Sequence, residues 1–578
     1  MYGFYVKTTE VTISKYFLHL IIITFFLTAC GTNKIPDIII TDINIIDIEK
    51  GDVIEHQDVQ IIGDKIYKIK DHQPADSKLT ETINGKGKFL IPGLWDMHAH
   101  IRSYSHEDVL PLFIMHGVTG IRDLGLTNFE LIKKWKDEIK KGEIIGPEIR
   151  TSGCIIEGST PSFRNSIVLT DVKRVKPVID SLIAKGVDLI KLYDTLNEEI
   201  YEAIIHYCKE NDLLSVGHIP PSLNQNSASE LGITSIEHLS GLDNTLHKYY
   251  SQEDFDKYIS ILQKKGTYQC PTLINYSFLA RLDVSKKEKN IILDQIDNDH
   301  KFDLAPKYYK AWWSRIKENY AKSKKYKGKS DKLTFYKDIV NKLNENGIKM
   351  LAGTDTPNPY LLPGLSLHEE LILLSEAGLS NSDVLKTTTL YPAQYFNEIN
   401  YTGTVSENAI ADLVILDANP LEDISNTQKI NAVILNGKPY SNTSLNSIRS
   451  SHLARMNEYS TTDFDQYIYM KLQKEGVNTI INNYVIPESN NDYTIEKNHL
   501  VRLSETLVEA GQINDAIKLL NWNIKIFPDY KTTYQTLGEL YLNQLDTTNA
   551  INSFEKIKAI DPLDSINLVI LKKIESSK

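Results

Sequence analysis

The fold of this chain is constrained most by an alternation of short apolar segments and amphipathic, helix-like segments between residues 105 and 395. A long series of this kind is typical of parallel strands joined by helical crossovers, and a (β/α)8 TIM-like barrel is its most economical arrangement. An open doubly wound sheet is the alternative, but no Gly-x-Gly-x-x-Gly sequence opens a helix here. The expected strands include residues 118–124, 187–194, 213–219, 235–239 and 348–355.

Strand-rich segments lie on both sides of this series, at residues 37–90 and 400–440. They contain isoleucine-rich or partly alternating runs, such as DIIITDINIIDI at 37–48, with turn residues between the runs. We expect the two segments to pair into a small β-sandwich domain that both chain ends supply, next to a barrel domain at residues 91–399. The predicted fold class is therefore α/β.

A repeat distinguishes the end of the chain, where Ala516 and Ala550 occupy equivalent positions 34 residues apart. This period and the helix-pair pattern around it resemble tetratricopeptide repeats, which implies an all-α repeat segment at residues 498–578. Two repeats are few for an independent solenoid, so packing on the rest of the protein and binding of a protein partner are both open. Residues 441–497 are polar, and we expect a linker or an extension there.

The first residues have the layout of a secretory signal. Lys15 precedes an apolar run at 16–27, which is short for a membrane span. The sequence Leu-Thr-Ala-Cys ends the run and resembles the bacterial lipobox. That resemblance implies a signal peptide at 1–29, lipidation of Cys30 and a tether at 30–36. It places the protein in the bacterial cell envelope, lipid-anchored in the outer membrane or facing the periplasm. A core helix or an uncleaved anchor is the alternative.

Charge and cysteine content narrow the remaining chemistry. The formal net charge of −11 argues against nucleic acid as a partner. Cys154, Cys208 and Cys270 are widely spaced, which is typical neither of a disulfide framework nor of a Cys-x-x-Cys zinc site. We expect these three residues to be small members of the core.

Residues that can bind metal stand at the ends of the expected strands. His98 and His100 follow the run IPGLWDM, and two residues at this spacing in a strand point to the same side. In a (β/α)8 barrel, functional groups come from the C-terminal ends of several strands. Each residue alone could be an ordinary buried side chain, but their joint placement favours a metal site. The other members of the set are Lys191, His218, His238 and Asp355.

The chemistry of this set suits divalent ions. Neutral imidazoles and a carboxylate suit Zn²⁺ or a similar ion. Two such ions about 3.5–4 Å apart can activate one bridging hydroxide and polarise a substrate carbonyl. Asp355 could accept the proton of the hydroxide and pass it to the leaving amine. The free ammonium of Lys191 would repel two dications, whereas carboxylation by CO₂ would turn it into an anionic bridging ligand.

The order and content of these motifs resemble the metal-dependent amidohydrolase superfamily, and most closely its imidazolonepropionase-like and metallodipeptidase branch. The motifs are IPGLWDMHAHI, GVTGIRDLG, DLIKLYD, VGHI, SIEHL, LAGTDTP and IADLVILDANPLEDI. The resemblance implies a more buried metal held by His98, His100 and Asp355. It implies a second metal held by His218 and His238, with carboxylated Lys191 as the bridge.

The resemblance also implies a hydrolase that cleaves an amide or cyclic amide C–N bond, with a small amide or a dipeptide as substrate. Tyr193 and Arg122 lie near these positions in the sequence and are weaker candidates for substrate contact. The segment 152–165, where many relatives carry a Gly-His-rich loop, has no histidine, which leaves the substrate open. A mononuclear deaminase of the same superfamily and an anchored scaffold lipoprotein with an inactive barrel are the alternatives.

Overall fold

The computed structural model describes residues 35–575 except 74–80, 102–105, 127–128, 164–165, 243–251, 307–308, 311–312, 314–315, 318–327, 400, 459–475, 479–480, 482–498, 510 and 563. The expected signal peptide and Cys30 lie outside the described residues, as does most of the expected linker. None of the helices within the described residues combines the length and the apolar composition that a membrane crossing requires.

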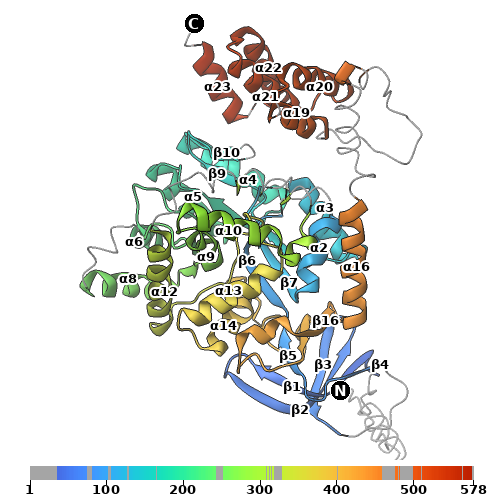
Figure 1. Ribbon diagram of the computed structural model, residues 1–578. Coiled ribbons are helices and arrows are strands. Elements are labelled where there is room, and N and C mark those ends of the chain that lie inside the picture. The colour runs from blue at the N-terminus through green and yellow to red at the C-terminus, as the bar shows by residue number, and fades with distance from the viewer. Residues whose placement is uncertain are drawn as a thin grey trace, which may run out of the picture.

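Strands from both ends of the chain form one eight-stranded sheet (Figure 1). In this sheet β5 lies between β1 and β15, and its antiparallel pairing with β15 aligns Leu90 with Ile415. Ile40, Ile43 and Ile45 of β1 are buried in one apolar cluster with residues from both chain ends. The two-layer form of a sandwich stays a prediction. The strands are β1 (Ile38–Asp47), β2 (Asp52–Ile62), β3 (Lys65–Asp71), β4 (Glu81–Asn84), β5 (Phe89–Pro92), β15 (Leu413–Leu416), β16 (Ile430–Leu435) and β17 (Lys438–Ser441).

Two parallel sheets lie between these chain ends in the sequence. The first has the order β6-β7-β8, and the second has the order β10-β9-β11-β12-β13-β14. Most of these strands are fully buried along their length, as expected where helices cover parallel strands. Their bounds are β6 (Leu94–Ala99), β7 (Val118–Asp123), β8 (Glu148–Thr151), β9 (Ile155–Glu157), β10 (Ile167–Val168), β11 (Leu189–Leu192), β12 (Leu214–Gly217), β13 (Ser235–Glu237) and β14 (Tyr268–Cys270).

Backbone hydrogen bonds connect the edges of the two parallel sheets. Asp188 N donates to Thr151 O at 2.9 Å, which joins the start of β11 to the end of β8. On the other side, the segment 350–356 accepts a hydrogen bond from Met97 N of β6 and donates one to Gln269 O of β14. The C-terminal ends of strands that are far apart in the sequence therefore face one region of the molecule.

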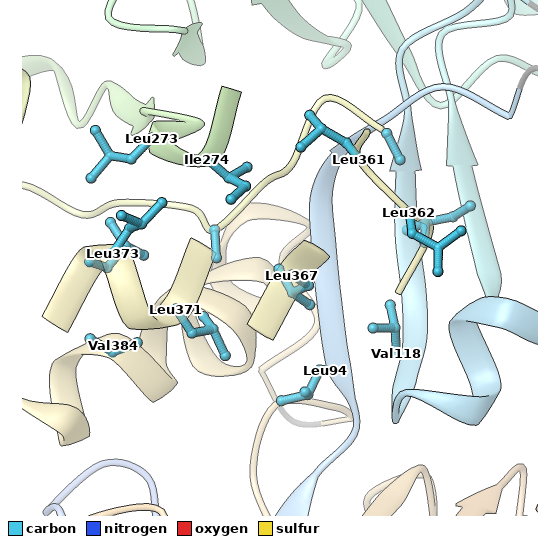
Figure 2. Packing of buried hydrophobic residues seen from close by; sticks show 14 of the residues in the cluster. Leu94, Val118, Leu273, Ile274, Leu361, Leu362, Leu367, Leu371, Leu373 and Val384 are labelled. Carbon is cyan, nitrogen blue, oxygen red and sulfur yellow. The ribbon is translucent and has the colours of Figure 1, made fainter. Parts of the chain in front are cut away.

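Helices follow most of these strands, as the alternation in the sequence predicts. Figure 2 shows Leu367 and Leu371 of α13 beside Leu94 of β6, in the largest buried apolar cluster. This packing fixes the strands from outside and so fixes the side chains at their ends. The helices are α2 (His106–Met115), α3 (Phe129–Lys140), α4 (Val175–Lys185), α5 (Glu198–Glu210), α6 (Gln225–Leu231), α8 (Gln252–Lys265), α9 (Leu273–Arg281), α10 (Lys286–Asp297), α12 (Lys329–Glu345), α13 (Leu365–Glu376), α14 (Asn381–Thr388) and α15 (Leu390–Tyr395).

The C-terminal part of the described chain is helical. α16 (Asn442–Glu458) follows β17 directly, and its Arg455 pairs with Glu107 and Asp108 of α2. This helix occupies the start of the segment that the sequence left as a linker or an extension. Further helices are α19 (His499–Glu509), α20 (Ile513–Ile526), α21 (Lys531–Asn543), α22 (Thr547–Ile560) and α23 (Ser565–Glu575). Ala516 of α20 and Ala550 of α22 are fully buried, and the tetratricopeptide resemblance stays a prediction.

Candidate metal centre

His98 and His100 stand at the end of β6, on the side that faces the segment 350–356. His98 is the fifth residue of this fully buried strand, and the backbone of Gly353 lies so close that a Cβ there would be 2.6 Å from His98 Cβ. His98 Nδ1 lies 2.6 Å from Glu237 Oε2, and His100 Nδ1 lies 3.1 Å from Gly125 O. Because a carboxylate and a carbonyl only accept, both Nδ1 atoms donate, which leaves each Nε2 as an acceptor.

Asp355 follows the bridging segment and lies among three of the histidines. Its Oδ1 is 3.4 Å from His98 Nε2 and 3.2 Å from His100 Nε2, and its Oδ2 is 3.8 Å from His238 Nε2. The ligand atoms of His98, His238 and Asp355 all lie within 4.8 Å of one another. Lone pairs that converge in this way repel unless a cation lies among them. These residues could therefore hold a metal ion.

The outer side of Asp355 is also occupied. Its Oδ2 accepts hydrogen bonds from Asn275 Nδ2 at 2.9 Å and from Asn358 Nδ2 at 2.6 Å. Burial opposes ionisation of Asp355, but His238 and His98, when protonated, and hydrogen bonds from His100 and His98 outweigh it and hold the pKa of the carboxyl well below its usual range. Asp355 is therefore an ionised carboxylate in a fixed orientation. The sequence pattern missed both asparagines, because neither belongs to a strand-end motif.

His238 follows β13, and His218 follows β12. His238 Nδ1 lies 2.6 Å from Thr272 Oγ1, which orients Nε2 toward Asp355. The ring of His218 meets the ring of His238 edge-on at 4.9 Å, so His218 joins the cluster through His238. Burial lowers the pKa of His218 to about 4 and the pKa of His238 well below its usual value. Both imidazoles are therefore neutral near pH 7, as metal ligands must be.

Lys191 is the third residue of β11, where it pairs with Val216 of the neighbouring strand. Its side chain is only 1% exposed, and its Nζ has no hydrogen-bond partner among the residues that the structure describes. Burial lowers the pKa of Lys191 to about 8, so a substantial fraction of the amine is neutral near that pH. A buried amine without a partner needs a reason, and reaction of a neutral amine with CO₂ would supply one. His98 Nε2 is likewise a buried polar atom without a hydrogen-bond partner.

The backbone at the centre adopts a conformation that side chains disfavour. Asp355, His238 and Thr272 have φ angles of 63°, 59° and 48°, in the left-handed region. Each such residue costs on the order of 1–3 kcal/mol and persists only where the surroundings hold it. His238 contacts both Asp355 and Thr272, so the surrounding fold holds three strained residues next to one another in the chain of contacts.

Arg122 lies beneath the histidines and not at a surface that a substrate could contact. It is fully buried, and its guanidinium donates to Met97 O at 2.5 Å, Ser235 Oγ at 2.8 Å and Glu237 Oε1 at 2.8 Å. Its donors are thus used within the protein, which differs from the expected contact with substrate. Arg122 instead holds Glu237, whose other oxygen accepts from His98.

A second group of possible ligand atoms is formed by His98, Glu237 and Cys270. Here Glu237 is already neutralised by Arg122 at 2.8 Å. Burial raises the pKa of the Cys270 thiol well above its usual value, which disfavours the thiolate that a metal requires. This group therefore orients His98. Cys208 and Cys270 are fully buried and Cys154 is partly buried, and all three are free thiols.

Gly217 lets β12 approach β11 at the position directly before His218. Its φ is 147°, and a Cβ there would lie 2.0 Å from Leu192 O. We expect Gly217→Ala to lower the free energy of unfolding by about 3 kcal/mol, because the strand pair must separate. Gly186→Ala is the matched control, since Gly186 also has a positive φ but open space around it, and we expect a cost of about 1 kcal/mol. Urea unfolding of both variants measures the difference, and equal losses would contradict it.

Glu370 of α13 binds the backbone next to the candidate metal centre. Its carboxylate accepts from Leu273 N at 2.9 Å and Ile274 N at 2.6 Å, directly after Thr272. Burial raises the pKa of Glu370 to about 8. The folded chain therefore binds this proton more tightly than the unfolded chain does. The resulting stabilisation is fully present below the ordinary pKa of glutamate and is lost as pH rises through about 8.

We therefore expect the free energy of unfolding to fall by on the order of 3 kcal/mol between pH 5 and pH 9 because of Glu370. Glu370→Gln should remove this part of the fall, as measured by urea unfolding at a series of pH values. Glu369→Gln on the same helix is the control, because Glu369 is only partly buried and pairs with Lys301. A Glu370→Gln profile parallel to that of the parent would contradict the expectation.

A comparison with protein families matches one family over more than half of the chain. A profile described as "Amidohydrolase family" matches residues 89–440. Solved structures with the same fold include a Xaa-Pro dipeptidase with bound methionine (TM-score 0.54, 19% identity, covering 70% of this chain and 99% of that chain). A bottromycin amidohydrolase gives a TM-score of 0.58 at 20% identity, covering 72% of this chain and 90% of that chain.

Curated relatives match over shorter stretches. An adenine deaminase of Clostridium botulinum (strain Loch Maree / Type A3) is 31% identical over 87 residues, which cover 15% of this chain and 14% of that protein. A 5'-deoxyadenosine deaminase of Methanocaldococcus jannaschii is 29% identical over 147 residues, which cover 25% of this chain and 32% of that protein. The chain thus spans about a seventh of the length of the first of these relatives and about a third of the second.

Proposed function

Since the chain belongs to the amidohydrolase family, we propose that it is a metal-dependent hydrolase that cleaves the C–N bond of an amide or cyclic amide, with dipeptides as the first candidates. The observation that carries the proposal is the convergence of Asp355 with the Nε2 atoms of His98, His100 and His238. We infer further that the two parallel sheets close into a (β/α)8 barrel through the segment 350–356. The strand ends then surround this centre.

The residues fit two divalent ions, zinc being the first candidate. His98, His100 and Asp355 would hold one ion, and His218 and His238 would hold the other. Lys191 would bridge them as a carbamate, because its buried Nζ has no other partner. Bound divalent ions supply Lewis-acid chemistry, which activates water and polarises a carbonyl.

Side chains of this protein can then transfer the proton. Asp355 is ionised and lies at the centre, so it can accept a proton from the attacking water and deliver it to the leaving nitrogen. Asn275 and Asn358 hold its outer oxygen during this transfer. The Nδ1 partners of His98, His100 and His238 keep the three Nε2 atoms directed inward.

A deaminase is the second candidate, because the curated relatives with local matches are described as adenine deaminase and 5'-deoxyadenosine deaminase. Lys191 distinguishes the amide hydrolase from the deaminase, since a mononuclear site does not need a bridging carbamate. We also propose lipid anchoring through Cys30 in the cell envelope and a partner-binding or packing role for the C-terminal helices. A scaffold with an inactive barrel would fit these two features but would leave the convergent ligand set without a use.

The test is a substrate screen with purified, metal-reconstituted protein. Dipeptides, cyclic amides and adenine are assayed in parallel, with His98→Ala as the inactive control. Release of amino acids, or ring opening, that the control lacks supports the proposal. Ammonia release from adenine alone favours the deaminase, and no turnover in a protein that retains bound metal contradicts both.

A further inference from the structure

Glu157 at the end of β9 accepts hydrogen bonds from the loop that follows it. Its fully buried carboxylate accepts from Ser162 N at 2.7 Å, Phe163 N at 3.1 Å and Ser166 Oγ at 2.5 Å. Thr195 Oγ1 lies 3.4 Å from the same carboxylate and also accepts from the backbone N of the residue after Glu157, at 2.9 Å. A buried carboxylate whose partners are mostly the donors of one loop holds that loop in one shape.

The loop held by Glu157 places an aromatic ring beside the candidate metal centre. Phe163 meets the ring of Tyr193 edge-on at 5.4 Å, and Tyr193 stacks on His218 at 4.2 Å with 30° between the rings. Phe163 and Tyr193 are only partly buried, so parts of both side chains remain accessible. We call this pair of rings the aromatic wall.

The aromatic wall adjoins the centre at His218. Tyr193 of the wall stacks on His218, and His238 contacts both His218 and Asp355. In the proposed reaction the leaving nitrogen must lie next to Asp355, which supplies its proton. The acyl side of the scissile bond then extends toward His218 and meets the wall.

From this geometry we propose that Phe163 and Tyr193 select substrates with a large apolar or aromatic group on the acyl side of the scissile C–N bond. Glu157 is the positioning residue that keeps Phe163 in the wall. The inference rests on the proposed function, because that function sets which side of the substrate faces Asp355. Burial of an apolar substrate group against these aromatic rings is favourable because it removes apolar surface from water. A small or charged group gains no such free energy.

The first test compares kcat/KM for Phe-Ala and Gly-Ala, which differ only on the acyl side. The parent should prefer Phe-Ala by about 10- to 100-fold. Phe163→Ala should lose most of this preference through a higher KM for Phe-Ala, with Gly-Ala unchanged, and Phe163→Leu should lose part of it. Tyr401→Ala is the control, because Tyr401 is 55% exposed outside the centre. Thermal melting of each variant checks that it is folded.

The second test addresses the role of Glu157. Glu157→Gln replaces one acceptor oxygen with a donor, so it cannot satisfy all the loop donors. We expect a higher KM for Phe-Ala, with kcat for Gly-Ala and bound metal unchanged. A structural defect would lower the activity on both substrates and the metal content together. A preference for Phe-Ala that Glu157→Gln leaves intact would overturn the positioning role.

The outcomes separate the inference from the proposed function. The selective role of the aromatic wall is contradicted if the parent cleaves both dipeptides without preference. It is also contradicted if the Phe163→Ala variant keeps the preference. A parent that cleaves neither contradicts the proposed function. In that case isothermal titration calorimetry with 3-phenylpropanoate tests the wall directly. Weaker binding to Phe163→Ala than to the parent supports it, and equal binding overturns it.

Discussion

Asp355→Asn is expected to lower kcat by about 10³-fold or more, with a smaller effect on KM. The carboxylate has two acceptor oxygens: Oδ1 faces His98 and His100, and Oδ2 accepts from the amides of Asn275 and Asn358. An asparagine side chain turns one of these acceptors into a donor. It then faces either the two amide donors or the metal position with the wrong group, and it cannot carry the proton. Steady-state kinetics on the best substrate of the screen measures the loss.

Asp194→Asn is the matched control for Asp355→Asn. Asp194 is also an acidic residue next to a histidine of the centre, but its Oδ2 lies 4.0 Å from His218 Nδ1 and its side chain is 46% exposed. Its charge is therefore screened by water, and we expect kcat to change by no more than about threefold. An Asp355→Asn variant with full metal content and near-parental kcat would falsify the proton role.

Lys191→Met is expected to reduce bound metal from about two ions per chain to one or none. Methionine keeps the apolar stem and the volume of the buried side chain but cannot form a carbamate. The same substitution removes a buried amine that has no partner, so the metal-free protein should melt at the same temperature or higher. Loss of metal without loss of stability separates a ligand role from a structural one. Elemental analysis and thermal melting of the metal-free protein provide the two measurements.

Two further observations decide how the Lys191 result is interpreted. Carbon-13 NMR of the parent after incubation with labelled bicarbonate and zinc should show a carbamate signal that Lys191→Met lacks. Lys185→Met on an exposed helix end is the control for the loss of one lysine. About one metal ion per chain in parent and variant alike would contradict the bridging role and favour the mononuclear deaminase.

The strand-end residues were predictable because their signal is local. A two-residue spacing at the end of a buried strand fixes the side to which His98 and His100 point, whatever lies elsewhere in the chain. The alternation of strands and helices then places the ends of parallel strands together, which brings His238 and Asp355 to the same region.

Arg122 shows where the local pattern stops being informative. Its closeness in sequence to site positions made it a candidate for substrate contact, but the side chain is buried and pairs with Glu237, 115 residues away. The strand pattern gives the position of a residue along a strand. It does not show whether a charge is neutralised by a distant partner, because that partner comes from another strand.

By itself, the sequence determined the α/β alternation and predicted which histidines, which lysine and which aspartate stand at the ends of strands. Only the tertiary structure decided how these groups are held. Glu237 reaches His98 across 139 residues, Asn275 reaches Asp355 across 80, and Glu157 gathers the donors of its loop around Phe163. The physical reason is that periodicity records the direction of each side chain relative to its own backbone. Hydrogen-bond partners and ring contacts depend on how separate elements pack, which no local pattern encodes.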